Sequence, residues 1–220
     1  MYKTETHLHT AETSLCGVLT AKEVVELYHE AGYKTLFVTD HFHKNYFNKL
    51  GEGSWDEKFQ TFLSGYKAAK AEGEKYGMNI ILAAEITFTT APNDYILIGA
   101  TEEFLYSCED KFEWGIEKFY PYAKQHGVTV IQAHPYRDDI CFPTPEFVDA
   151  IEAYNTNPRH ENYDEKACEI AAKYNKPVTA GSDTHRDTDV ALSAVLSEEE
   201  IKTGDDYLRL LFEGKLEFLH

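Results

Sequence analysis

The sequence lacks the features that mark several classes of protein. No apolar run approaches the roughly 20 residues that a transmembrane helix needs, and the first residues, Met1 to His7, contain no apolar core of a signal peptide. The four cysteines form no Cys-x-x-Cys pair, and the chain has neither a Gly-x-Gly-x-x-Gly fingerprint nor a P-loop. We therefore expect a cytoplasmic protein in a reducing compartment, without disulfides or a nucleotide-binding motif.

The sequence also has few basic residues. It contains 21 Lys and Arg against 38 Asp and Glu, which gives a formal net charge of −17 with His neutral. Such a chain is repelled by phosphate backbones and by anionic lipid surfaces, so we expect neither a nucleic acid nor a membrane as a partner. Bound divalent cations would offset part of this charge, which directs attention to the ten His residues.

Short apolar runs, typical of buried strands, alternate along the chain with longer helical patterns. Seven runs are strand candidates: Tyr2–His7, Thr35–Thr39, Ile80–Ala84, Asp94–Ile98, Val128–Ile131, Ala150–Tyr154 and Pro177–Ala180. Five stretches have helical periodicity: 18–30, 55–76, 112–125, 162–174 and 205–212. This alternation predicts a single α/β domain over residues 1–220, with a mainly parallel sheet wrapped by helices, either as a barrel or as an open sheet.

Polar side chains with metal-binding chemistry stand at most of the predicted strand ends. They are His7 and His9, Asp40 and His41, Glu85, His134, and Asp183 with His185. In a parallel barrel all these ends lie on one face, so residues far apart in the sequence converge in space. His7 and His9 are two residues apart on an extended chain, so both project to the same side. The set as a whole predicts one shared site.

The residue types in this set indicate transition-metal chemistry. Imidazole and carboxylate ligands without a cysteine cluster suit Zn, Fe or Mn better than Ca or Mg. Five His residues together with Glu85 and Asp183 exceed the ligands of one ion, so we expect at least two ions with one bridging carboxylate. A two-metal site fits hydrolysis of a phosphate ester by a metal-activated hydroxide.

The motifs in this order resemble the polymerase and histidinol phosphatase (PHP) domain family over nearly the whole chain. They are His7-x-His9-Thr10, Thr39-Asp40-His41, Glu85, Ala133-His134-Pro135 and Gly181-Ser182-Asp183-x-His185. The segment from His9 to Gly17, His-Thr-Ala-Glu-Thr-Ser-Leu-Cys-Gly, is similar to the stand-alone bacterial phosphoesterases of that family. The resemblance implies a distorted seven-stranded (β/α)7 barrel with two or three divalent transition metals at the carboxyl ends of its strands.

The resemblance also implies how the ligands divide among the metals. His7, His9, Glu85 and Asp183 hold the first metal; Glu85 bridges to a second, held also by His134; His41 and His185 hold a third, while Asp40 orients a ligand. The chain departs from the family pattern at two places. No His follows the fourth strand, in residues 97–103, and Cys16 stands where relatives often have Asp, so either Cys16 or Glu12 is a candidate ligand of the third metal.

Cationic side chains beside these motifs are candidates for binding phosphate. Arg137 follows the His134 motif, and Arg159 and His160 follow the sixth strand; His160 is also a candidate acid for the leaving group. With Asp183 they form the predicted catalytic set. We also expect the aromatic segment from Phe42 to Trp55 to form a loop over the site.

The sequence thus predicts a metal-dependent phosphoesterase acting on a small phosphorylated substrate. A histidinol-phosphate phosphatase is an alternative of the same class. A second alternative is a metal-stabilised regulatory module without catalysis, which would be expected to have lost ligands, whereas most are retained. A third is hydrolysis of an amide or ester, because amidohydrolases share the barrel and the two-metal arrangement.

Overall fold

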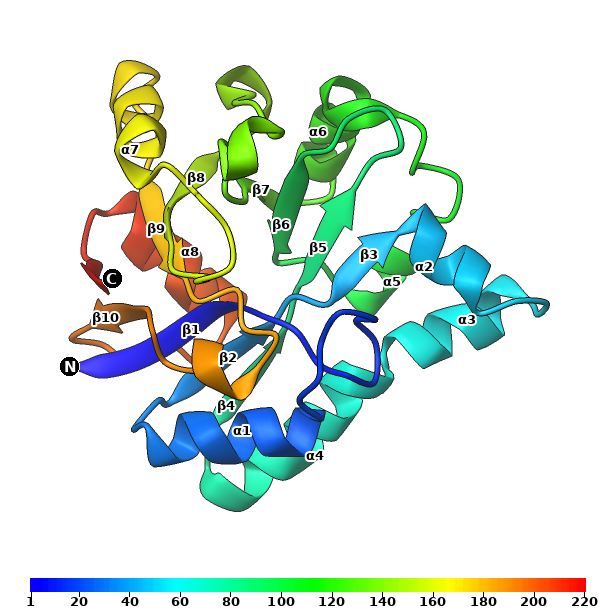
Figure 1. The fold of residues 1–220 in the computed structure, drawn as a ribbon, viewed down its shortest axis with the longest axis horizontal. Helices are drawn as coiled ribbons and strands as arrows, with labels where there is room; N and C mark the ends of the chain where they lie inside the picture. The colour runs from blue at the N-terminus through cyan, green and yellow to red at the C-terminus, as the bar shows by residue number, and fades with distance from the viewer.

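The computed structural model describes residues 1–220 as a mixed α/β fold (Figure 1). Its strands are β1 Tyr2–Leu8, β2 Thr35–Val38, β3 His41–His43, β4 Asn79–Leu82, β5 Ala84–Thr87, β6 Asp94–Ile98, β7 Thr129–Gln132, β8 Ala150–Asn155, β9 Val178–Gly181, β10 Ala194–Ser197 and β11 Glu217–Leu219. Its helices are α1 Ala21–Glu30, α2 Lys44–Lys49, α3 Trp55–Phe62, α4 Ser64–Tyr76, α5 Glu102–Tyr106, α6 Gly115–Gln125, α7 Asp164–Lys173 and α8 Gly204–Phe212. The predicted α/β class is confirmed.

Local sequence signals set several helix boundaries. Thr20 and Glu23 form a capping box at the start of α1, and Ser54 and Glu57 do the same for α3, so the first backbone N–H groups of both helices are satisfied. Gly77 ends α4 in the left-handed region at φ 62°, which costs glycine nothing. The helix predicted over 55–76 is two helices, because the chain turns at the fully buried Leu63.

The strands form two hydrogen-bonded sheets that join into a ring. One sheet has the order β11-β10-β1-β2-β4 and the other β3-β5-β6-β7-β8-β9. The β2–β4 ladder continues into the β3–β5 ladder, because the N–H of Ala83 donates to the carbonyl of Val38. Leu8, at the end of β1, pairs with Thr184 beyond β9. Seven strand segments therefore follow one another around a closed, distorted barrel.

Two features of the strands were not predicted. β6 runs antiparallel to both β5 and β7, whereas the other ladders of the ring are parallel, as the sequence predicted. A reversed strand has the same apolar composition as a parallel one, so its direction was not visible in the pattern. The strands β10 and β11 extend the sheet beyond β1 and were not predicted, because they are short and the exposed β11 lacks a buried face.

The core consists of three clusters of buried residues, which lie on the two faces of the strands. Phe37, Ile96, Ile131 and the α8 residue Tyr207 belong to a cluster that joins β2, β6 and β7 to α8. The helices α1 and α4 lie together against β1 and β2 (Figure 1). The largest cluster packs α2, α3, α5, α6 and α7 against the strands from β3 to β8. Alternate residues of each strand thus face the inside of the barrel and the outer helices.

The aromatic segment predicted as a loop over the site is part of this core, so that prediction was wrong. Phe42 lies in β3 and Tyr46 and Phe47 in α2, and all three are buried among other aromatic rings. Burial of such rings stabilises the fold by roughly 1.5–3 kcal/mol each, which outweighs exposure in a loop. None of the helices has the length and apolar character of a membrane span.

Candidate metal centre

The predicted ligands meet at one end of the barrel. They come from β1 (His7 and the following His9), from the start of β3 (His41), from β5 (Glu85), from the segment after β7 (His134) and from the segment after β9 (Asp183 and His185). Three overlapping groups of these side chains have ligand atoms within 4.8 Å of one another. The convergence expected from the strand-end pattern is therefore present.

Glu85 lies at the centre of the cluster and is buried. Its Oε1 atom is 3.3 Å from Nε2 of His7 and 3.1 Å from Nε2 of His134. Its Oε2 atom is 2.7 Å from Nδ1 of His41 and 3.5 Å from Nε2 of His9. Burial by itself raises the pKa of Glu85, but the charges of His7 and His41 hold that pKa well below its usual value. One ionised carboxylate thus contacts four imidazoles.

Asp183 is the second buried carboxylate of the cluster. Its Oδ1 atom is 3.2 Å from Nε2 of His9 and 3.3 Å from Nδ1 of His185. Its Oδ2 atom accepts a hydrogen bond of 2.6 Å from Nη2 of Arg137. The backbone of Asp183 has φ 50° and that of His134 has φ 27°, in the left-handed region that most side chains avoid. Such strain is kept where the surroundings fix a functional side chain.

Several buried atoms of the cluster have no hydrogen-bond partner. They are Nε2 of His7, Nε2 of His9, Nδ1 of His41, Oε2 of Glu85 and Oδ1 of Asp183. A buried polar atom without a partner is costly, and here the unpartnered atoms are nitrogen and oxygen lone-pair donors that face one another. A bound cation satisfies such a set, so the residues present fit the divalent metals that the sequence predicts.

Glu152, on β8, contacts two members of the cluster, His7 and His134, and was not predicted. Its Oε1 atom is 2.8 Å from Nδ1 of His7, and its Oε2 atom accepts from the N–H of His134 and the side chain of Asn155. A carboxylate that holds the far nitrogen of an imidazole fixes the ring and its tautomer. The signal was available, since Glu152 interrupts an apolar run much as Glu85 does.

Asp40 lies outside the cluster and reaches it through Ser14. Its carboxylate accepts hydrogen bonds from the N–H of Thr10 and the hydroxyl of Ser14, and Ser14 Oγ lies 3.1 Å from Nδ1 of His9. Burial raises the pKa of Asp40 to about 6, against the lowering by its hydrogen bonds from Thr10. Gly65 is required here, because a Cβ would lie 2.0 Å from Thr10 Oγ1.

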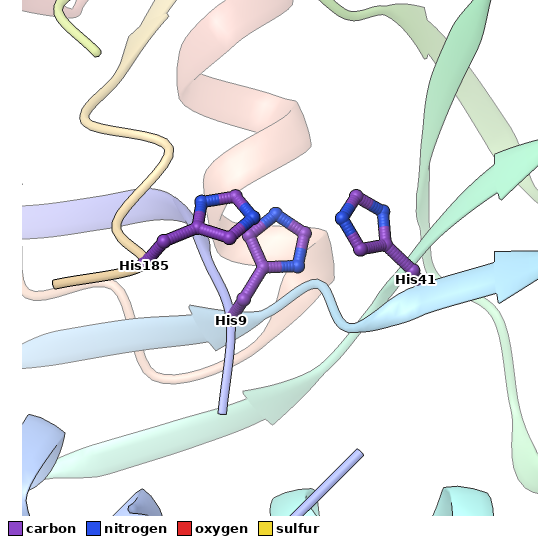
Figure 2. A group of neighbouring side chains, drawn as sticks. All are labelled: His9, His41 and His185. Atoms are coloured by element: carbon purple, nitrogen blue, oxygen red, sulfur yellow. The ribbon is translucent and has the colours of Figure 1, made fainter. Parts of the chain in front are cut away.

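Three imidazoles of the cluster lie close to one another, those of His9, His41 and His185 (Figure 2). The ring of His9 lies 4.2 Å, centre to centre, from those of His41 and His185. The exposed thiol of Cys16 is 3.2 Å from Nε2 of His41. Partial burial of the sulfur opposes its ionisation, but hydrogen bonds with His185 and His41 lower the pKa of this thiol to about 6. Cys16 is therefore brought to these rings.

Glu12, the alternative to Cys16, is not brought to the cluster. Both oxygens of its carboxylate accept from the N–H of Ala21, at 3.0 and 2.8 Å. Ala21 is the first residue of α1, where backbone N–H groups have no partner within the helix. The carboxylate of Glu12 is thus bound to the N-terminus of α1.

Among the residues predicted to bind the substrate, one contacts the cluster and the other two pair with carboxylates outside it. Arg137 contacts Asp183 directly, whereas the guanidinium of Arg159 makes two hydrogen bonds to the buried Asp189. His160 is 2.7 Å from Asp138 through its Nδ1 atom. It lines a cavity of about 460 Å³ together with Asn155 and Asn157.

The fold and the cluster together define an α/β barrel with a histidine and carboxylate centre at the carboxyl ends of its strands. The sequence matches the PHP domain over residues 5–178 and the PHP-associated region over residues 161–216. The chain therefore belongs to the PHP domain family. No curated protein matches it in sequence.

Solved structures share the fold at low identity. PsfC from Pseudomonas syringae is 16% identical with a TM-score of 0.68, over 99% of this chain and 91% of that one. A two-domain protein from Bacteroides vulgatus, containing a predicted PHP-like metal-dependent phosphoesterase, is 17% identical with a TM-score of 0.69, over 99% of this chain and 64% of that one. An amidohydrolase from Chromobacterium violaceum, with bound sulfate and no metal, is 14% identical with a TM-score of 0.57, over 97% of each chain.

Proposed function

We propose that this protein is a metal-dependent phosphoesterase that acts on a small phosphate ester. The observation that carries the proposal is the buried Glu85, which contacts four imidazoles whose inward nitrogens mostly lack hydrogen-bond partners. Membership of the PHP family and the Bacteroides vulgatus neighbour support the same reaction class. The net charge of −17 supports a small substrate over a nucleic acid.

The proposed ligand sets follow the contacts in the cluster. His7, His9, Glu85 and Asp183 hold one metal; Glu85 and His134 hold a second; His41 and His185, with Cys16, hold a third. Bound divalent metals of this kind supply Lewis acidity toward phosphate oxygens and lower the pKa of water. Zn, Fe and Mn all suit these donors.

Arg137 is the proposed phosphate contact among the three candidates of the sequence. Its Nη2 donates to Asp183 and Asn155, and its Nε donates to Asn162, so the guanidinium is held in place. The Nη1 atom makes no hydrogen bond within the chain and is free to donate to a phosphate oxygen. Arg159, occupied by Asp189, is proposed to position the His185 segment instead.

His160 is the proposed source of the proton for the leaving alcohol. The loop after β8 carries it, and its Nδ1 atom pairs with Asp138. This carboxylate orients the ring, and the Nε2 atom makes no hydrogen bond within the chain, which leaves it for proton transfer. The adjoining cavity of about 460 Å³ has the size of a small-molecule site.

Hydrolysis of an amide is a second candidate, favoured by the amidohydrolase among the structural neighbours. The test is turnover of p-nitrophenyl phosphate, bis-p-nitrophenyl phosphate, histidinol phosphate and a p-nitroanilide by metal-loaded protein, before and after chelation. We expect turnover of a phosphate ester that chelation abolishes and added metal restores. Turnover of the anilide alone would favour the amidohydrolase. No turnover of any ester or amide, with metal bound, would favour a regulatory module.

A further inference from the structure

The reversed direction of β6 brings a carboxylate to the cluster that the sequence did not predict. In an all-parallel barrel the residues after each strand face the site, and residues 99–103, after β6, contain no His. Because β6 runs antiparallel to β5 and β7, its first residue lies at the edge where those strands end. That residue is Asp94, and the residues after β6 lie at the opposite end of the barrel.

The register of β5 and β6 turns the Asp94 side chain to the same face as Glu85. Thr87 pairs with Asp94 and Glu85 pairs with Ile96, and residues directly opposite one another share a face. The Ile96 side chain belongs to the cluster that α8 completes, so this face is the inside of the barrel. Asp94 thus projects beside Glu85 by the alternation of the strand alone.

The side-chain contacts of Asp94 leave one of its two carboxylate oxygens facing His134. The hydroxyl of Thr87 donates to Oδ1 of Asp94, and Oδ2 is 3.9 Å from Nε2 of His134. Glu85, Asp94 and His134 each offer a ligand atom within 4.8 Å of the others. Glu85 and His134 are 1% exposed, Asp94 is 20% exposed, and Oε1 of Glu85 is 3.1 Å from Nε2 of His134. The three donors therefore come together from β5, from the start of β6 and from the segment after β7.

We infer that Asp94 is the ligand that completes the second metal position, and that it makes this position the oxygen-rich one of the centre. This inference deepens the proposed function and rests on its metal sites. Two carboxylates and one imidazole favour harder cations such as Mn²⁺. The third position, with His41, His185 and Cys16, has nitrogen and sulfur donors that favour Zn²⁺. The centre binds unlike metals at its two outer positions.

The test compares Asp94→Asn and Asp94→His with Glu113→Gln in the full-length protein. Asn keeps an acceptor for Thr87 and removes the charge, whereas His replaces oxygen by nitrogen. Glu113 pairs with Lys44, which lines a cavity of about 320 Å³ with Asp94, so its variant controls for loss of a nearby charge. Each protein is dialysed against Mn²⁺ and Zn²⁺ together, and metals per chain are counted by mass spectrometry. Circular dichroism checks the fold.

We expect Asp94→Asn to bind Mn²⁺ at least roughly tenfold more weakly while keeping its Zn²⁺, and Asp94→His to bind extra Zn²⁺ in its place. Glu113→Gln should match the parent. Equal Mn²⁺ content and affinity in Asp94→Asn and the parent would overturn the inference, whatever the activity. Conversely, a protein with no esterase turnover whose Mn²⁺ still depends on Asp94 would refute the proposed function and leave this inference standing.

Discussion

The floor and the rim of the site differ in what fixes their side chains. The floor residues are His7, His9, Glu85, Glu152 and Asp183; all are buried and contact one another. The rim residues, all exposed, are Glu12, Cys16, Arg159 and His160. Of these, only the thiol of Cys16 contacts the cluster, because the other three pair with groups outside it. A buried side chain of the floor can contact only the residues packed around it. An exposed side chain of the rim pairs instead with the nearest complementary group.

The largest effect should follow from Glu85→Gln. The amide lacks the charge that four imidazoles contact, so the proposed first and second metals would lose a shared ligand. We expect phosphate-ester turnover to fall by at least roughly 10²–10³-fold. Metal content per chain should fall with it, while circular dichroism stays native. Full activity with full metal content would show that Glu85 is a structural carboxylate only.

The next effect should come from Glu152→Gln, which weakens the floor without touching a proposed metal. The variant loses the charge that holds Nδ1 of His7. Loss of such a support lowers metal affinity by roughly 10- to 100-fold. Competition with a fluorescent chelator measures this affinity. An unchanged affinity would mean that packing alone orients His7.

On the rim, Cys16 should react as a thiolate in metal-free protein. Its pKa of about 6 lies below that of an ordinary thiol, so the reactive form accumulates as the pH rises through that value and is nearly complete at about pH 7. Burial raises the pKa of Cys108 to about 12, so that thiol should stay inert. Iodoacetamide labelling followed by mass spectrometry gives the rates, with Cys16→Ser as control. A Cys16 rate still climbing above about pH 8 contradicts this account, and Zn²⁺ should slow the reaction if the thiol is a ligand.

The smallest effect on catalysis should come from Arg159→Ala. Its guanidinium holds Asp189, which also accepts from the N–H groups of His185 and Arg186. Leaving that buried carboxylate unpaired should cost about 1–3 kcal/mol of the free energy of unfolding, measured with urea. We expect kcat/KM to change by less than roughly tenfold. A large loss of kcat/KM at unchanged stability would instead assign Arg159 to the phosphate.

The strands could be predicted because burial requires a regular pattern of apolar residues in the sequence. The seven predicted runs overlap the seven segments of the ring, and the five predicted helical stretches overlap α1, α3 with α4, α6, α7 and α8, whereas the short α2 and α5 were not predicted. The direction of β6 could not be predicted, since direction depends on which edge the chain returns to and not on composition. The segment from Phe42 to Trp55 was misassigned because aromatic residues near a motif also suit a core.

The floor of the site was predictable for a similar reason. Its ligands stand at strand ends, where the barrel fixes their position, and the metal chemistry limits the residue types. Glu152 and Asp94 were missed, the first inside a strand and the second at the start of a reversed one. The partners of Arg159 and His160, which are Asp189 and Asp138, could not be predicted, because the sequence does not encode these distances.

The pairing of Leu8 with Thr184 makes a seam between the end of β1 and the segment after β9. His7 and His9 stand on one side of this seam, and Asp183 and His185 stand on the other. Contacts between such distant parts of a chain carry a large entropic cost of closure. The proposed cation between His9 and Asp183 would therefore stabilise the closed barrel at this contact. Its removal should speed opening at the seam before the β5–β6 hairpin loosens.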